Sequence, residues 1–194
     1  MKNIRNMAMI GILSAISLVL MLFDFPLPIF PSFLKIDLSD MPALLAAFSM
    51  GPLYGVLVAL IKNLLYIPMS STGGVGPLAN FIVGAAFVLP AGFFYRANKT
   101  KKGAALGLVC GILLMGVAGA LANRFIIIPF YITVMGIPLE AIIKMSAAIF
   151  PQVETLFDVI IYSIVPFNIF KGVVISLITL LSYKKLSPLI KFKR

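Results

Sequence analysis

The chain has 194 residues, of which 61% are hydrophobic and only 11% are charged. Soluble domains are about 45–50% apolar and about 25% charged, so this composition excludes an ordinary water-soluble fold and indicates a protein embedded in a lipid bilayer. The net charge of +10 is carried by basic residues at the ends of apolar segments, which argues against a nucleic-acid-binding surface, and the absence of histidine removes the commonest general base and metal ligand.

The length and the apolar pattern predict an all-α membrane protein. One domain covering residues 1–194 has room for roughly six crossings of about 20 residues each, with their connections. In chain order, the predicted helices cover residues 7–23, 41–50, 53–67, 77–95, 103–131 and 153–183. We therefore expect a compact bundle of six transmembrane helices, in which the segment 41–50 is short for a crossing.

The connections between these helices also carry signals. The first apolar segment has no small-residue cleavage signature, so we expect a retained helix rather than a signal peptide. A proline-rich stretch at 24–31 ends that helix, and residues 32–40 mix polar and apolar types as an ordered external loop does. Residues 68–76 form a second predicted loop, and residues 136–150 are expected to hold a short amphipathic helix.

The distribution of charge predicts the orientation. Residues 2–5, 96–102 and 184–194 hold 11 of the 16 basic residues. The positive-inside rule places all three clusters, and hence both termini, in the cytoplasm. An even number of crossings must then precede the cluster at 96–102, which requires the short segment 41–50 to count as a crossing.

Several polar residues fall inside the apolar segments, where they are costly and usually functional. These residues are Lys62, Asn63, Asn80, Asn123, Arg124, Asn168 and Lys171. At about 1.5 Å per residue, they gather in the outer half of the bundle, which predicts a pocket open to the outside. Asn168 and Lys171 are spaced i, i+3 and therefore share one helix face, which favours a role in binding a ligand.

Some of these residues also have a structural alternative. Asn63 and Asn80 fit hydrogen bonds that tie helices together. Lys62 fits a structural ion pair with Glu154 or Asp158. Arg124 fits a side chain that reaches along its helix to the outer membrane interface. These alternatives stay open beside the binding role.

Gly11 and Ala15 form a stripe of small residues on the first helix, which suits either close packing inside the bundle or a docking face for a partner protein.

Residues 71–76 are glycine-rich but lack the lysine and hydroxyl of a nucleotide-binding loop, so ATP hydrolysis by that route is excluded. No cluster of cysteine or histidine predicts a metal site, and no cofactor is expected.

Four motifs resemble a known family. They are FLKIDLSDMPAL at 33–44, IKNLL at 61–65, TGGVG at 72–76 followed by ANF at 79–81, and PFNIFKG at 166–172. Together they resemble the substrate-binding S components of energy-coupling factor (ECF) transporters, specifically the riboflavin-binding (RibU) type, over nearly the whole chain. Tyr66 and Pro77 depart from that type, in which we expect a histidine and an acidic residue.

The resemblance implies a function without catalysis. Such a subunit of the cell membrane captures one vitamin from outside and docks onto a transmembrane coupling subunit with two ATPase subunits, which drive import. The docking role falls on Gly11 and Ala15. The ligand contacts fall first on Asn168 and Lys171, then on Asn123 and the first external loop; the expected site comprises Asn168, Lys171, Asn123, Asp40, Leu34, Asn80 and Lys62.

Riboflavin suits this set of side chains. A carboxamide both donates to and accepts from the pyrimidine edge of a flavin, and an ammonium donates to its carbonyl or ring nitrogen. Two alternatives are an S component for a different vitamin or precursor, and a membrane enzyme acting on lipids or isoprenoids. The enzyme would need acidic metal ligands or histidine at the cytoplasmic face, whereas all six acidic residues are predicted outside.

Overall fold

The computed structural model describes the backbone of residues 2–190 and the side chains of residues 4–183. Lys191, Lys193 and Arg194 of the predicted cytoplasmic charge cluster therefore lie outside the described residues. The elements are α1 (Lys2–Leu22), β1 (Phe25–Pro26), β2 (Lys35–Ile36), α2 (Asp40–Ser49), α3 (Pro52–Tyr66), the 3₁₀ turn η1 (Ile67–Met69), α4 (Val75–Ala97), α5 (Lys101–Ala122), the π-helix η2 (Asn123–Ile127), α6 (Ile128–Thr133), α7 (Leu139–Ala147), α8 (Leu156–Asp158), the π-helix η3 (Val159–Ile164) and α9 (Val165–Ile190).

The all-α class predicted from composition is confirmed, and the number of crossings is confirmed only in part. Among the described residues, five helical stretches are long and apolar enough to cross a membrane: Ile4–Leu22, Pro52–Met69, Val75–Ala97, Lys101–Thr133 and Leu156–Tyr183. The helix α2 has 10 residues and spans only about 15 Å, half of a hydrocarbon core of about 30 Å. The predicted sixth crossing therefore has no helix of its own that is long enough.

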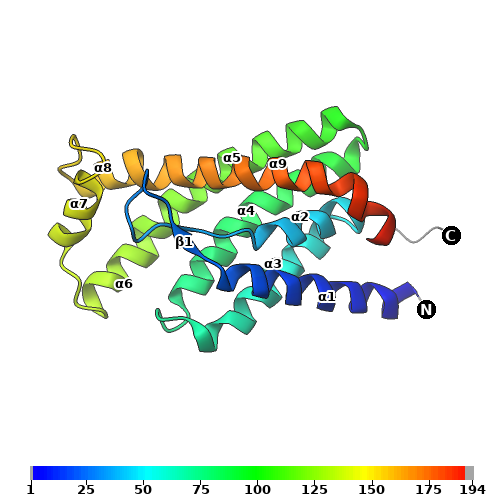
Figure 1. The fold of residues 1–194 in the computed structure, drawn as a ribbon, viewed down its shortest axis with the longest axis horizontal. Coiled ribbons are helices and arrows are strands. Elements are labelled where there is room, and N and C mark those ends of the chain that lie inside the picture. Colours follow the sequence, from blue (N-terminus) through cyan, green and yellow to red (C-terminus); the bar gives the residue numbers. More distant parts are fainter. Residues whose placement is uncertain (1, 191–194) are drawn as a thin grey trace.

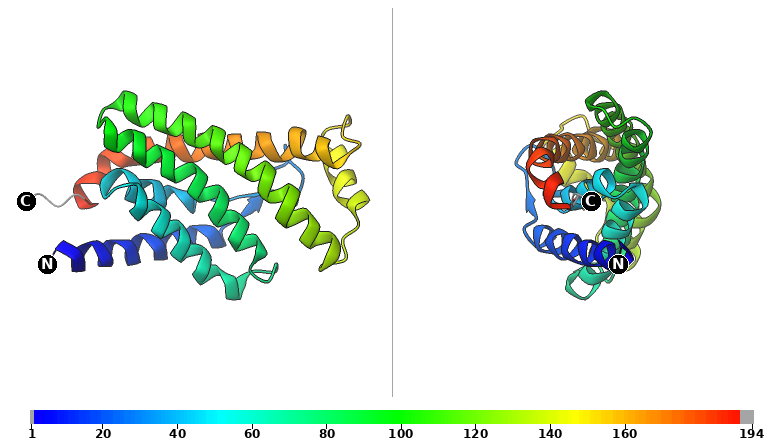
Figure 2. Two further views of the ribbon diagram at one scale, coloured as in Figure 1. Left: turned by 180° about the vertical axis from the view of Figure 1, so that it is seen from behind. Right: turned by 90° about the vertical axis from the view of Figure 1, so that its right-hand side faces the viewer.

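The long helices pack alongside one another and form one bundle (Figures 1 and 2). The start of α1, the end of α9 and the turn between α4 and α5 lie at one end of the bundle. The hairpin of β1 and β2 lies toward the opposite end, where α7 and α8 are also found (Figure 1). The backbone segments 2–5, 96–102 and 184–190 thus share one end of the bundle, and the predicted external loop 24–40 lies away from it.

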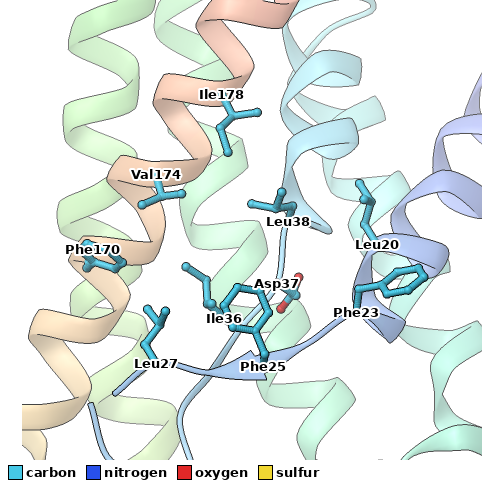
Figure 3. A pocket seen from close by; sticks show the side chains of 10 residues that line it. All are labelled: Leu20, Phe23, Phe25, Leu27, Ile36, Asp37, Leu38, Phe170, Val174 and Ile178. Atoms are coloured by element: carbon cyan, nitrogen blue, oxygen red, sulfur yellow. The ribbon is translucent and has the colours of Figure 1, made fainter. Parts of the chain in front are cut away.

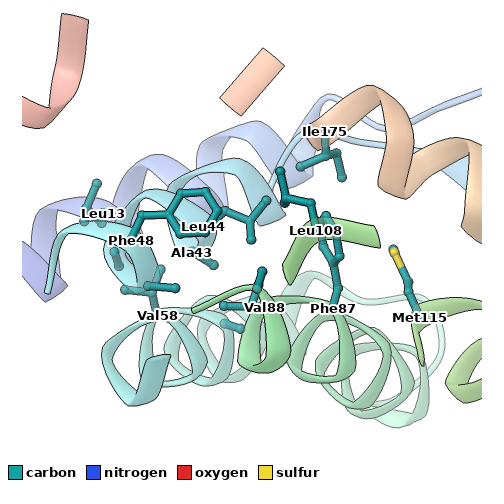
Figure 4. Packing of buried hydrophobic residues seen from close by; sticks show 14 of the residues in the cluster. Leu13, Ala43, Leu44, Phe48, Val58, Phe87, Val88, Leu108, Met115 and Ile175 are labelled. Carbon is teal, nitrogen blue, oxygen red and sulfur yellow. The ribbon is translucent and has the colours of Figure 1, made fainter. Parts of the chain in front are cut away.

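The short helix α2 lies at the centre of the bundle, in contact with α1, α3, α4 and α9. Its apolar side chains are buried on every side, including Leu44 and Phe48, and they pack against Val58, Phe87 and Leu108 from the surrounding helices (Figure 4). A helix that is apolar all round must be buried by its neighbours. This explains why ten residues can form a stable helix here.

Glycine permits the close approach of α3 to this core. A side-chain carbon added at Gly55 would lie 2.6 Å from the carbonyl oxygen of Ala43 on α2 and from a methyl group of Val88 on α4. Gly51 adopts φ of 124°, which lets the chain reverse between α2 and Pro52 at the start of α3.

Two π-helical segments interrupt helices that the sequence predicts as continuous. The segments η2 and η3 each end two residues before a proline, Pro129 and Pro166 respectively. Proline has no N–H to donate to the carbonyl four residues earlier, which in these helices belongs to Phe125 and Tyr162 inside the π segments. Such π segments occur frequently at functional sites, and these two flank the cavity described next.

Candidate functional site

A cavity of about 190 Å³ lies between the loop 24–40, which the sequence predicts to be external, and the helices α4, α5 and α9. Its lining joins residues that are far apart in sequence: Phe33, Leu34, Lys35, Asp40, Gly76, Ala79, Asn80, Val83, Met115, Asn123, Phe167, Asn168 and Lys171. Every predicted ligand contact except Lys62 is in this set. The structure thus brings the predicted residues to one place, while their role in binding stays a prediction.

Asn168 and Lys171 project from one face of α9, as their spacing predicts. The side-chain amide of Asn168 donates to the carbonyl of Ile164 at 2.8 Å, which leaves its second N–H and its carbonyl oxygen for another partner. Gly119 on α5 makes room for this carboxamide, because a side-chain carbon at that position would overlap it. The carboxamide is therefore oriented by a hydrogen bond to the preceding helical turn and by close packing against Gly119 of α5.

Lys171 is held by the loop 24–40. Its ammonium donates to the carboxylate of Asp37 at 2.7 Å and lies 4.0 Å from the nearest carboxylate oxygen of Asp40. An ammonium has three N–H donors, so this ion pair leaves donors for a further acceptor. The loop residue Asp37 was not among the predicted site residues, and its distance of 134 positions from Lys171 explains why the sequence gave no signal for the pair.

Lys62 contacts Asp40 and Ser39, and this corrects the expected pair with Glu154 or Asp158. The ammonium of Lys62 lies 2.5 Å from the carboxylate of Asp40 and 2.6 Å from the hydroxyl of Ser39. Asp158 instead accepts hydrogen bonds from Thr155 at the start of α8.

The geometry of α8 explains the difference. Asp158 completes the N-terminal cap of this helix, and Glu154 just before it is exposed, so neither faces Lys62. Lys62 therefore does not line the cavity itself; it contacts Asp40, which does.

The four charges form one buried network. Lys62 is 0% exposed and Asp40 1%, and Asp40 offers one oxygen to each lysine. Two ammonium and two carboxylate groups cancel in charge, which allows them to be buried together. Ser39 ties this network to α1, because its carbonyl accepts a hydrogen bond from the Ser17 hydroxyl at 2.8 Å.

The electrostatics of Asp37 reflect this arrangement. The two carboxylate oxygens of Asp37 accept hydrogen bonds from the Lys171 ammonium at 2.7 Å and from the Ser39 backbone N–H at 2.8 Å. Both donors stabilise the ionised form of this buried carboxylate. It keeps Lys171 at the wall of the cavity as a fixed counter-ion.

Asn80 and Asn123 offer further polar groups to the cavity. The side-chain oxygen of Asn80 is buried and makes no hydrogen bond within the described residues. Asn123 donates to the carbonyl of Gly119 at 2.9 Å and keeps its oxygen for another partner. Asn63 donates to Ala59 on its own helix, so the expected tie between helices is not seen for it. Buried polar atoms normally have hydrogen-bond partners. The side-chain oxygen of Asn80, which has none within the described residues, is therefore a candidate ligand contact.

A second, apolar cavity of about 410 Å³ lies next to the first, between the end of α1, the hairpin of β1 and β2, and α9 (Figure 3). Phe23, Phe25 and Phe170 contribute aromatic walls, and Asp37 also lines this cavity. The Asp37–Lys171 ion pair therefore stands between a polar cavity and an apolar one.

The remaining predicted residues lie elsewhere. Gly11 and Ala15 are exposed on α1, and a side-chain carbon at Gly11 would meet no described atom within 4 Å, so this stripe does not pack inside the described bundle. Pro77 lines a separate apolar cavity of about 90 Å³ between α3 and α4, and Tyr66 is half-buried nearby. Neither departure from the family pattern lines the polar cavity.

Comparison with known proteins decides the family. The model of the family described as "ECF transporter, substrate-specific component" matches residues 5–183. The chain is an ECF transporter S component. A solved structure described as "Structure and mechanism of the S component of a bacterial ECF transporter" aligns with a TM-score of 0.75 and 36% identity, covering 98% of this chain and 99% of that chain.

Curated relatives of this S component share its full length. The riboflavin transporter RibU of Staphylococcus aureus (strain TCH60) is 36% identical over 191 residues, which covers 98% of this chain and 95% of the relative. The riboflavin transporter FmnP of Bacillus subtilis (strain 168) is 36% identical over 195 residues, covering 99% and 97% respectively. Together with the five long apolar helices, these matches make the S component a multi-pass membrane protein of a transport family rather than an enzyme.

Proposed function

We propose that this S component captures riboflavin from outside the cell in the cavity lined by Asn168 and Lys171. The observation that carries the proposal is that Asn168 and Lys171, on one face of α9, line the same cavity and each keep hydrogen-bonding capacity beyond the contacts they already make. The similar proteins named riboflavin transporters support the choice of ligand.

The chemistry of the cavity matches an isoalloxazine ring. The pyrimidine edge of the ring presents an N–H donor beside carbonyl acceptors, and the Asn168 carboxamide can serve both. Lys171 supplies a charged donor for a carbonyl or ring nitrogen. Phe33, Phe167 and Met115 provide the apolar walls that a tricyclic ring needs.

The first external loop is the part that must move to admit the ligand. A cavity of about 190 Å³ is smaller than the roughly 300–1,000 Å³ typical of small-molecule sites. Phe33, Leu34 and Lys35 cover it from the loop, and the loop is secured at its surface by the partly exposed ion pair of Lys35 with Asp24 at 3.2 Å. Exposed ion pairs contribute at most about 1 kcal/mol, so opening the loop here costs little.

The proposed topology has six crossings with both termini in the cytoplasm. The extended segment 37–39 followed by α2 serves as one crossing, and its backbone can do so because it is buried inside the protein rather than exposed to lipid. The basic end of the bundle then faces the cytoplasm and the cavity faces outward. The exposed stripe of Gly11 and Ala15 docks a transmembrane coupling subunit, which two ATPase subunits drive.

The test is riboflavin binding by detergent-purified protein, followed as quenching of flavin fluorescence, with thiamine and biotin as competitors. We expect selective quenching by riboflavin. Lys171→Ala should weaken affinity at least about tenfold, because a charge-assisted hydrogen bond contributes about 1.5–3 kcal/mol. Lys144→Ala, at an exposed lysine of α7, is the matched control.

The outcomes separate the alternatives. A folded, helical sample that quenches no riboflavin fluorescence would remove riboflavin and direct the search to other vitamins. Equal affinities of Lys171→Ala and Lys144→Ala would remove Lys171 from the site.

A further inference from the structure

The end of the bundle opposite the candidate site carries a larger cavity, of about 520 Å³. It lies between the turn that joins α4 to α5 and the end of α9, and it is lined by Tyr95, Lys99, Thr100, Lys101, Ala104, Leu180, Leu181 and Tyr183. The apolar span Val75–Ala97 ends just before these residues, and the span Lys101–Thr133 begins among them. The cavity therefore lies at the level where hydrocarbon meets the headgroups of one leaflet.

The wall of this cavity is an ordered aromatic cluster. The ring centroids of Tyr95 and Tyr183 are 4.9 Å and 5.7 Å from that of Phe48, at the end of the central helix α2. The two tyrosine hydroxyls lie 3.2 Å apart. Tyrosine favours the membrane interface, because its ring is apolar and its hydroxyl is polar. This wall is anchored in the protein core.

The charges around the cavity have one sign. Lys99 and Lys101 line it, and the sequence contains no acidic residue between positions 41 and 139. The acidic residues that the chain does contain lie in the outer loops or near the start of the last helix. The lysines of the cavity therefore face no carboxylate of the described chain that could neutralise them.

The opposite wall is apolar and open to the bilayer. Leu180 and Leu181 of α9 line the cavity, and Leu181 is 77% exposed. Leu177, one turn deeper in the membrane, is also exposed. A cationic rim above an apolar groove is complementary to a molecule that has an anionic head and a hydrocarbon tail.

We propose that this cavity binds an anionic phospholipid of the adjacent leaflet. Lys99 and Lys101 hold the phosphodiester and the acidic headgroup, and an acyl chain lies along Leu180 and Leu181. With the topology proposed above, the leaflet is the cytoplasmic one, which is rich in anionic lipid. The site is separate from the riboflavin cavity and does not depend on the identity of the vitamin.

The test compares phosphatidylglycerol with phosphatidylcholine of the same acyl chains, titrated onto the detergent-purified protein and followed by native mass spectrometry. We expect preferential binding of phosphatidylglycerol. The variant Lys99→Gln with Lys101→Gln should lose about 10- to 30-fold in affinity for this lipid, because each lysine near a membrane surface contributes about fivefold. Both side chains are exposed, so the substitutions should leave folding and riboflavin binding unchanged.

The matched control removes the same charge from the same turn. Arg96→Gln with Lys102→Gln alters two basic residues that do not line the cavity, and the Arg96 guanidinium lies near Gly51 instead. This control should keep its affinity for phosphatidylglycerol.

Three results would overturn the proposal. The first is equal loss in both double variants, which would mean general charge attraction. The second is protection against thermal unfolding by inorganic phosphate equal to that by the lipid, which would mean a simple anion site. The third is unchanged lipid binding with impaired assembly with the coupling subunit, which would assign the lysines to a protein partner.

Discussion

Replacing Lys62 by methionine should destabilise the protein strongly, and the further replacement of Asp40 by asparagine should restore much of the loss. Methionine keeps a long unbranched side chain but removes the ammonium that contacts Asp40 at 2.5 Å. The buried network then contains two carboxylates and one ammonium. With Asn at position 40 as well, only the neutral pair of Lys171 and Asp37 remains, and its 2.7 Å contact is untouched.

The magnitude follows from burial. Both partners are almost fully buried, and removing one partner of a buried ion pair costs about 3–5 kcal/mol. We expect a loss of this size for Lys62→Met and for Asp40→Asn alone. The double variant should recover at least about 2 kcal/mol relative to the sum of the single losses, because no uncompensated charge stays buried.

The assay is the free energy of unfolding in mixed detergent micelles, measured by circular dichroism for the four proteins of this double-mutant cycle. Lys144→Met, at an exposed position, controls for loss of a lysine. The reasoning would be refuted by single variants that lose less than about 1 kcal/mol, the range of exposed pairs, or by a double variant that loses the full sum.

Three further predictions concern the cavity and its counter-ion. Gly119→Ala should weaken riboflavin binding several-fold, because the added side-chain carbon displaces the Asn168 carboxamide. Gly116→Ala on the same helix is the control and should not weaken binding, because the nearest side-chain atom there is 3.4 Å away. Equal affinities of the two variants, measured by fluorescence quenching, would contradict this prediction. Asp37→Asn should lower the free energy of unfolding by about 3–5 kcal/mol, because it removes one partner of the buried ion pair with Lys171. A loss below about 1 kcal/mol in the same unfolding assay would disprove the assignment. Lys171→Arg should recover only part of the affinity lost in Lys171→Ala, because a planar guanidinium does not replace an ammonium in a closely packed site; full recovery in the same quenching assay would show that charge alone matters.

Much of the candidate site could be predicted because bilayer physics makes polar residues conspicuous. Asn168, Lys171 and Asn123 stand out in apolar segments, and the rise per residue places them at similar depth. The cavity indeed joins these three with Asp40 and Leu34 of the external loop.

The choice of ion partners could not be predicted in the same way. Depth along a helix says which residues share a level but not which of them face each other. The expectation that Lys62 pairs with Glu154 or Asp158 was wrong. Asp158 caps its own helix through Thr155, while the loop 24–40 folds inward and presents Asp40 to Lys62. Asp37 was missed for the same reason.

The sequence by itself determined that the protein is embedded in a bilayer, that it is helical, and to which family it belongs. Composition, the length of apolar runs and local motifs can all be read without knowing which segments meet in space. The sequence also predicted that Asn123, Asn168 and Lys171 lie at a similar level along the bundle, and all three line one cavity. Only the tertiary structure decided that α2 is a buried core helix, that Asp40 is shared between Lys62 and Lys171, and that the Asp37–Lys171 pair separates two cavities. These features depend on which faces of distant segments meet, and that is set by packing around α2 and not by any local pattern.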